Sequence, residues 1–204
     1  MSPSISVTKR EAITAAVRHS VRETSVYDIH THLYDPAFGE LLLWGIDDQL
    51  VYHYLVAEAF RHFDIGYDDF WRLAKEDQAQ MIWDALFVEN SPLSEACRGV
   101  LTVLNRLGLD ANQRDLPGIR NWFAEQDPND YITRCMELAK VKTICMTNSP
   151  FDDLETPQWD AGFERDDRFT SALRIDPLLL EWDAAAPRLA KAGYEVQVDF
   201  SGKT

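Results

Sequence analysis

The sequence lacks extended runs of basic residues. Acidic side chains outnumber basic ones by 34 to 20, which gives a formal net charge of −14. Binding to nucleic-acid phosphates or to anionic membrane surfaces depends on clustered positive charge, so we expect neither kind of partner. A small anionic substrate remains compatible with this charge, because one well-placed arginine can dominate the local field.

Cysteines and long apolar segments are also scarce. The three cysteines, Cys97, Cys135 and Cys145, are odd in number and have no Cys-x-x-Cys spacing. They are typical of buried thiols in a reducing compartment and do not form a disulfide framework. No segment approaches the roughly 18 apolar residues of a membrane span, and residues 1–21 have no apolar run of signal-peptide length. We therefore expect a soluble, cytoplasmic protein.

The order of local patterns indicates the fold class. Residues 25–32 are rich in β-branched and aromatic side chains, which predicts a strand buried on both faces. Helical periodicity dominates residues 33–140. Strand patterns return at residues 141–148 and 169–175, and a helical pattern then extends to Gly193. This order favours an α/β fold with a parallel sheet.

The first predicted strand contains the motif Asp28-x-His30-x-His32. Residues two apart in a strand share a face, so these three side chains are expected to point the same way. Two imidazoles at this spacing can hold a divalent metal such as zinc, and the carboxylate could fix a ring tautomer. The alternative is a pair of polar residues bonded to the backbone at a strand end, because two histidines do not complete a metal site.

An aromatic triplet, Tyr52-His53-Tyr54, lies in a helical pattern. Neighbouring helical residues point about 100° apart, so at most two of the three can face one pocket. His53 suits proton transfer near neutral pH, and Tyr54 can donate to a carboxylate or hydroxyl. The alternative is an ordinary packed helix whose aromatic bodies lie in the core.

A single arginine, Arg174, lies between Leu173 and Ile175 in the third strand pattern. Its planar guanidinium matches a ligand carboxylate in bidentate fashion. The alternative is a structural ion pair, for which Asp176 is the nearest partner.

Two further patterns predict no ligand site. Residues 201–204 read Ser-Gly-Lys-Thr, but the earlier glycine that a phosphate-binding loop requires is replaced by Gln197. The acidic residues Asp152, Asp153 and Glu155 could bind a cation, but such a group of charges favours a solvated loop.

Several segments, in the same order along the chain, resemble uronate isomerase (glucuronate isomerase) of the amidohydrolase superfamily. They are residues 26–33, 38–47, 52–58, 94–101, 146–148, 150–153 and 172–179. The resemblance implies a (β/α)8 barrel of TIM type with a helical insertion after its first strand, at residues 33–140. It also implies interconversion of D-glucuronate with D-fructuronate and of D-galacturonate with D-tagaturonate.

The resemblance assigns roles to the residues noted above. His30 and His32 would be ligands of a divalent metal, expected to be zinc. His53 and Tyr54 would be catalytic and would contact the hexuronate, and Arg174 would bind its carboxylate. Family members are about twice as long, and their last strand supplies an aspartate ligand and an arginine. Since eight βα units need about 250 residues, we expect this chain to be the N-terminal portion of such an enzyme.

Two other hypotheses remain open. Another metal-dependent amidohydrolase, acting on an amide or lactone, would share the two histidines but not the contexts of Tyr52-His53-Tyr54 and Arg174. A non-catalytic chain could instead bind a uronate, or a partner through its helical block, since a third metal ligand is missing. The full-length protein could also form a homo-oligomer.

Overall fold

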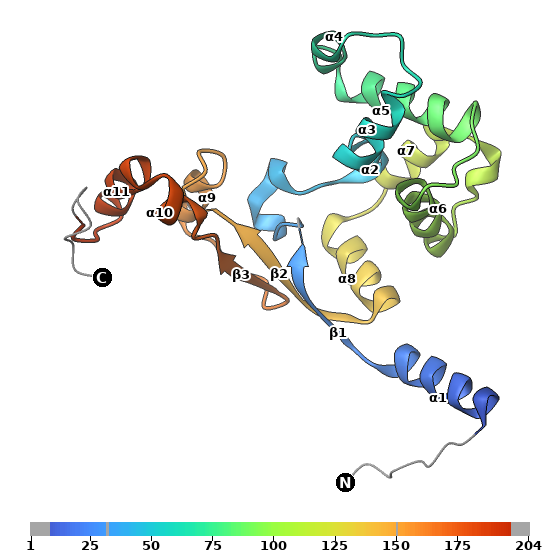
Figure 1. Cartoon of the computed structure of the whole chain (residues 1–204), viewed down its shortest axis with the longest axis horizontal. Coiled ribbons are helices and arrows are strands. Elements are labelled where there is room, and N and C mark those ends of the chain that lie inside the picture. Colours follow the sequence, from blue (N-terminus) through green and yellow to red (C-terminus); the bar gives the residue numbers. More distant parts are fainter. Residues whose placement is uncertain (1–8, 32, 150, 197–204) are drawn as a thin grey trace. The chain divides into compact units, whose positions relative to one another are not determined.

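A computed structural model describes residues 9–31, 33–149 and 151–196 (Figure 1). The chain divides into two compact units. We call Met1–His32 with Cys135–Thr204 the sheet unit, and Leu33–Arg134 the helical unit. No helix in the described ranges is long and apolar enough to cross a membrane.

The sheet unit contains a small parallel sheet. Its strands are β1 (Val26–Thr31), β2 (Val141–Asn148) and β3 (Phe169–Leu173), and their order in the sheet is β1-β2-β3. Both pairings are parallel, which confirms the predicted α/β class with a parallel sheet. Because parallel strands run in one direction, the carboxyl ends of all three strands lie at the same edge of the sheet.

Burial alternates along the central strand. Ile144, Met146 and Asn148 of β2 are buried, whereas the residues between them are only half-buried. This period of two is that of a strand with one covered face. The buried face continues into β3 through Phe169.

The first strand differs from the sequence prediction, which was wrong about its burial. Ile29 is 83% exposed and Tyr27 is 63% exposed, although residues 25–32 were predicted to be buried on both faces. The physical reason is that the face of the sheet on which Tyr27 and Ile29 lie is uncovered at β1, an edge strand paired with β2 alone among the described strands. Its apolar composition suits a strand with neighbours on both sides.

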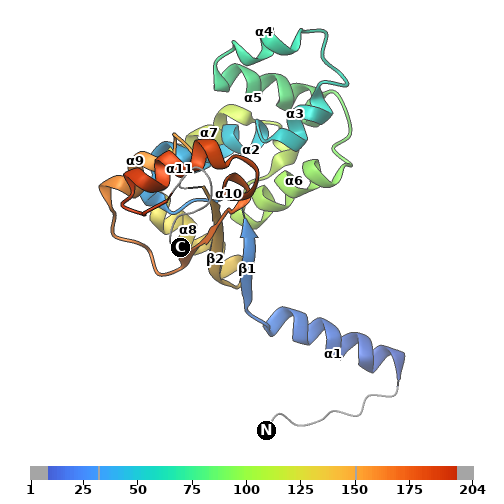
Figure 2. The ribbon, with the colours of Figure 1, turned by 60° about the vertical axis from the view of Figure 1, so that its left-hand side comes forward.

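Helices precede and follow the strands of the sheet unit. They are α1 (Arg10–Glu23), α9 (Thr156–Ala161), α10 (Asp176–Leu180) and α11 (Trp182–Lys191). Figures 1 and 2 show α9, α10 and α11 grouped beyond the carboxyl ends of β2 and β3. The predicted helical pattern before Gly193 therefore corresponds to α10 and α11, whereas the six-residue α9 was not predicted.

The helical unit has no strand among its described residues. Its α-helices are α2 (Gly45–Leu50), α3 (His53–Ala59), α4 (Tyr67–Trp71), α5 (Lys75–Trp83), α6 (Glu95–Leu107) and α7 (Leu116–Ala124), and α8 (Pro128–Ala139) runs from it into the sheet unit. Short 3-10 helices at Pro36–Leu41 and Ala111–Gln113 and a π-helical turn at Asp84–Val88 complete it. The core of the unit consists of fully buried side chains from several helices: Leu50, Ala59, Phe70, Ala79, Ile82 and Leu104.

Capping residues explain the ends of α6. The Ser94 hydroxyl accepts the backbone N–H of Cys97 at 3.1 Å, which satisfies one of the first free amides of the helix. Gly108 ends the helix with φ at 85°, in the left-handed region that glycine adopts without steric cost.

Arg120 of α7 connects three helices of the helical unit. Its Nε donates to Asp47 Oδ1 of α2 at 2.9 Å, and its terminal nitrogen donates to the Glu76 carbonyl of α5 at 2.8 Å. Burial raises the pKa of the Asp47 carboxyl, although the hydrogen bond and charge of Arg120 oppose that shift. The arginine therefore offsets only part of the desolvation cost of a partly buried carboxylate.

Candidate functional site

His30 lies near the carboxyl end of β1, with Asp28 two residues before it on the same strand. The Asp28 Oδ1 atom accepts the backbone N–H of His30 at 3.1 Å, so this carboxylate braces the strand beside the histidine. His32, the second predicted ligand, lies outside the described residues. No group of three His, Cys, Asp or Glu side chains that could hold a metal occurs within the described ranges.

Arg174 lies one residue beyond the end of β3 and is exposed. Its Nε is 3.5 Å from Asp176 Oδ2, and the two side chains are 57% and 63% exposed. The structural ion pair that the sequence offered as the alternative therefore exists, but such exposed pairs contribute little to stability. The guanidinium remains accessible for a second anion.

His30 and Arg174 flank the central strand at one edge of the sheet. His30 belongs to β1 and Arg174 follows β3, with β2 between these two strands. Ligand sites in parallel α/β folds form at the carboxyl edge of the sheet. The structure thus places one predicted metal ligand and the predicted carboxylate-binding residue at the edge where chemistry is expected.

The aromatic triplet belongs to the helical unit, at the start of α3. His53 is the first residue of the helix, and Tyr52 is its N-cap with an extended backbone (φ −65°, ψ 138°). The ring centroids of His53 lie 4.3 Å from Tyr52 and 4.1 Å from Tyr54. The three rings therefore gather in one cluster, with Tyr52 preceding the helix. That at most two of them face one ligand pocket stays a prediction.

The cluster is exposed. Tyr54 is 64% exposed, and His53 is also exposed, whereas the buried residues of α3 are Leu55, Val56 and Ala59. Burial raises the pKa of the half-buried Tyr52 phenol, and the neighbouring Tyr54 adds to the shift. The rings of His53 and Tyr54 are thus not part of a packed core, and both can contact a ligand.

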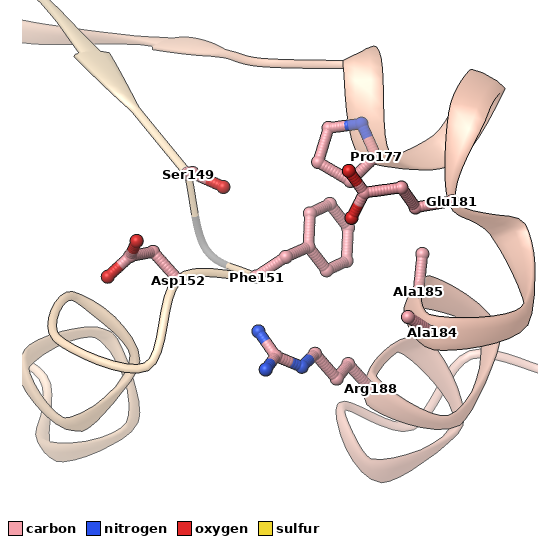
Figure 3. Close-up of a pocket in the computed structure, with 8 residues that line it drawn as sticks. All are labelled: Ser149, Phe151, Asp152, Pro177, Glu181, Ala184, Ala185 and Arg188. Carbon is pink, nitrogen blue, oxygen red and sulfur yellow. The ribbon is translucent and has the colours of Figure 1, made fainter.

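A pocket of about 220 Å³ lies beyond the ends of β2 and β3 (Figure 3). Its lining residues are Ser149, Phe151, Asp152, Pro177, Glu181, Ala184, Ala185 and Arg188. Figure 3 shows the Phe151 ring directed toward Pro177 and Ala185. On the adjoining loop, Asp153 accepts from Arg188 at 2.6 Å.

Sequence reasoning missed the role of Glu155. Asp153 is exposed, as the predicted solvated loop requires, but Glu155 is only 4% exposed. Its carboxylate accepts from Asn148 Nδ2 at 3.0 Å and from the backbone N–H of Ser149 at 3.1 Å. The available signal was Thr156-Pro157 directly after it, a dipeptide that favours the start of a helix over a solvated loop.

The arrangement defines a structural class. The chain is a mixed α/β protein with a small parallel sheet, a class whose ligand sites form at the carboxyl edge of the sheet.

The comparisons with known proteins include a similar solved structure. No family model matches the chain, and no curated protein does. A solved structure, that of an uronate isomerase from Bacillus halodurans, matches with a TM-score of 0.87 and 47% sequence identity. The match covers 94% of this chain but 46% of that chain, and it falls on an N-terminal portion. This confirms the resemblance to the N-terminal portion of uronate isomerase that the sequence predicts.

Proposed function

We propose that this chain is the N-terminal part of a hexuronate isomerase built on a (β/α)8 barrel. The observation that carries the proposal is the 47% identity to the Bacillus halodurans uronate isomerase across 94% of the chain. The exposed apolar side chains of β1 support it, because a barrel would cover them with further strands and helices. On this proposal, residues 33–140 are the helical insertion after the first barrel strand.

The proposed reaction interconverts D-glucuronate with D-fructuronate, and D-galacturonate with D-tagaturonate. The open-chain aldose loses the proton at C2, next to the C1 aldehyde, and a proton is returned to C1. The intermediate is an enediolate, whose oxygens need stabilisation while the proton is held by a base. The substrate carboxylate must also be held so that C1 and C2 meet that base.

We assign these tasks to the residues singled out above. Arg174 binds the substrate carboxylate through its planar guanidinium, which its weak pairing with Asp176 leaves accessible. His53 moves the proton, since an imidazole nitrogen can accept a proton and another can donate one. Tyr54, 64% exposed with its ring tilted against that of His53, donates a hydrogen bond to a substrate oxygen.

The donor set at the end of β1 suits a divalent metal. Imidazole nitrogens are preferred ligands of zinc, and His30 and His32 would hold the ion from one face of the strand. A zinc ion bound there would polarise the substrate carbonyl as a Lewis acid. Asp28 would keep its present role, accepting the His30 backbone N–H.

A chimera tests the proposal. This chain replaces the matching N-terminal portion of the Bacillus halodurans enzyme, and D-glucuronate or D-galacturonate is added in deuterated water. We expect conversion to the ketose with deuterium entering at C1, because a proton is returned there from an exchanging base. The controls are the chain alone and the remaining portion of the Bacillus enzyme alone.

The same samples are offered a lactone and an amide, which another metal-dependent amidohydrolase would hydrolyse. A folded chimera that neither isomerises the uronates nor exchanges their protons would overturn the proposal.

A further inference from the structure

We propose that Glu155 is a positioning residue that fixes the carboxyl ends of β2 and β3 and thereby sets the location of Arg174. The identity of the anion that Arg174 binds rests on the proposed function. The positioning itself rests only on the hydrogen bonds of the sheet unit.

The Glu155 carboxylate is buried among N–H donors. It accepts from the Asn148 side-chain amide at 3.0 Å, from the Ser149 backbone at 3.1 Å and from the Trp159 indole at 3.3 Å. A buried carboxylate is costly unless such donors replace water. These three donors come from the end of β2 and from α9, so the carboxylate holds the two elements in one arrangement.

Asn148 transmits this arrangement to Arg174. It is 2% exposed, pairs with Leu173 across the β2–β3 ladder, and accepts the Arg174 backbone N–H through its carbonyl oxygen at 3.2 Å. Glu155 therefore holds the side chain of Asn148, and the backbone carbonyl of Asn148 in turn holds Arg174. The hydrogen bond from the Arg174 N–H to the Asn148 carbonyl therefore fixes the backbone of the first residue after β3.

The orientation of the Asn148 amide supports the assignment. A carboxylate only accepts hydrogen bonds, so the Asn148 Nδ2 faces Glu155, and the opposite atom, Oδ1, is buried without a partner in the described part of the chain. The Asn148 amide keeps this orientation, although its Oδ1 has no partner in the described part of the chain, because Glu155 holds its Nδ2. Glu155→Gln would place an N–H donor among the N–H donors of Asn148, Ser149 and Trp159, so the Asn148 side chain would be held less firmly.

A second contact on the same loop provides a contrast. Asp153 and Arg188 form an ion pair at 2.6 Å on the outside of the loop, where the Asp153 side chain is 88% exposed. An exposed pair of this kind holds a loop weakly. The buried carboxylate, not this surface pair, is therefore the group that fixes the strand ends.

The test uses Glu155→Gln with Glu164→Gln as the matched control. Glu164 is exposed and lies nine positions further along the same connection. Amide hydrogen exchange is measured at Ser149 and Arg174 in the 204-residue chain, without substrate. We expect Glu155→Gln to speed exchange at both amides by about tenfold or more, since each loses part of its support. The control should leave both rates unchanged.

A kinetic measurement in the active chimera separates positioning from a general loss of stability. Glu155→Gln should raise the KM for D-glucuronate by about tenfold while changing kcat by less than about threefold, because the carboxylate-binding arginine moves whereas the proton-transfer residues do not. The melting temperature is recorded in parallel. If the chimera shows no isomerase activity, the proposed function fails, and the exchange rates still decide the role of Glu155.

A milder variant covers the case in which Glu155→Gln does not fold. Trp159→Phe removes one donor to the carboxylate and keeps the aromatic ring, so it should raise exchange at Arg174 by a smaller factor. Faster exchange at Ser149 with unchanged exchange at Arg174 would overturn the proposal, since Glu155 would then hold only its own loop. An unchanged KM in a folded, active Glu155→Gln chimera would overturn it as well.

Discussion

The guanidinium of Arg174 is only weakly engaged by its neighbour Asp176. Its partner Asp176 is 3.5 Å away and both are more than half exposed, so solvent screens their attraction. The backbone of Arg174 is instead held firmly, through its bond to Asn148. A fixed backbone with an accessible guanidinium is the arrangement that bidentate recognition of a carboxylate requires.

Replacing Arg174 by lysine tests this recognition. Arg174→Lys keeps the positive charge but loses the planar pair of donors, so we expect the KM for D-glucuronate in the chimera to rise by about tenfold, with a smaller fall in kcat. Steady-state kinetics on both uronates measure the effect. Arg165→Lys, the same change at an exposed position, is the control. Wild-type kinetics for Arg174→Lys would show that the arginine is structural.

At the scale of elements, Arg120 of α7 links this helix to α2 through Asp47 and to α5 through the Glu76 carbonyl. The distance from Arg120 Nε to Asp47 Oδ1 is 2.9 Å and both side chains are largely shielded from water. The pKa of the Asp47 carboxyl is nevertheless raised, with burial as the largest cause. The ionised carboxylate therefore carries a desolvation cost that Arg120 only partly offsets.

Removing the arginine should destabilise the helical unit. Arg120→Met keeps a long apolar stem but leaves Asp47 without its cationic partner, so we expect a loss of about 1–3 kcal/mol in the free energy of unfolding. Urea denaturation near neutral pH measures it. Arg72→Met removes a largely exposed ion pair with Asp69 and should cost less than about 1 kcal/mol.

The pH dependence has a definite sign. A carboxyl whose pKa is raised on folding binds its proton more tightly in the folded state, so its destabilising effect is present at neutral pH and fades as the pH falls through the raised pKa. Arg120→Met removes the interactions that lower this pKa. The loss of stability in the variant should therefore shrink toward acidic pH, and a loss that grows there would contradict the assignment.

Sequence patterns predicted some elements closely and missed others for identifiable reasons. The strand predicted at residues 141–148 has the same bounds as β2, and the helical periodicity predicted within residues 33–140 includes α6. The six-residue α9 is too short to show helical periodicity. The burial of Glu155 depends on Asn148 and Trp159 being brought together by folding, which no local pattern reveals.

For the molecule as a whole, the edge of β1 is the most consequential surface. Ile29 is 83% exposed and Val26 is 44% exposed on a strand with one hydrogen-bonded neighbour. Exposed apolar edge strands promote association with other chains. On the proposed function, the remaining barrel strands would cover this edge.

The 204-residue chain should therefore self-associate when studied alone. We expect concentration-dependent oligomers in analytical ultracentrifugation, and Ile29→Lys should shift the population toward monomer because a charge at an edge opposes strand pairing. Leu154→Lys, at an exposed leucine of a loop, is the control and should change little. A purely monomeric wild-type chain at high concentration would contradict this expectation.

The pairing of β1 with β2 has a kinetic consequence. Val26 pairs with Val141, so the whole helical unit lies between two strands that are neighbours in the sheet. Closing so long a loop costs chain entropy before any contact between β1 and β2 can offset it. Ile144 of β2 and its partner Phe169 of β3 are closer in sequence than Val26 and Val141. The segment of β2, α9 and β3 can thus assemble early, and β1 joins after the helices between β1 and β2 have folded and shortened the distance it must span.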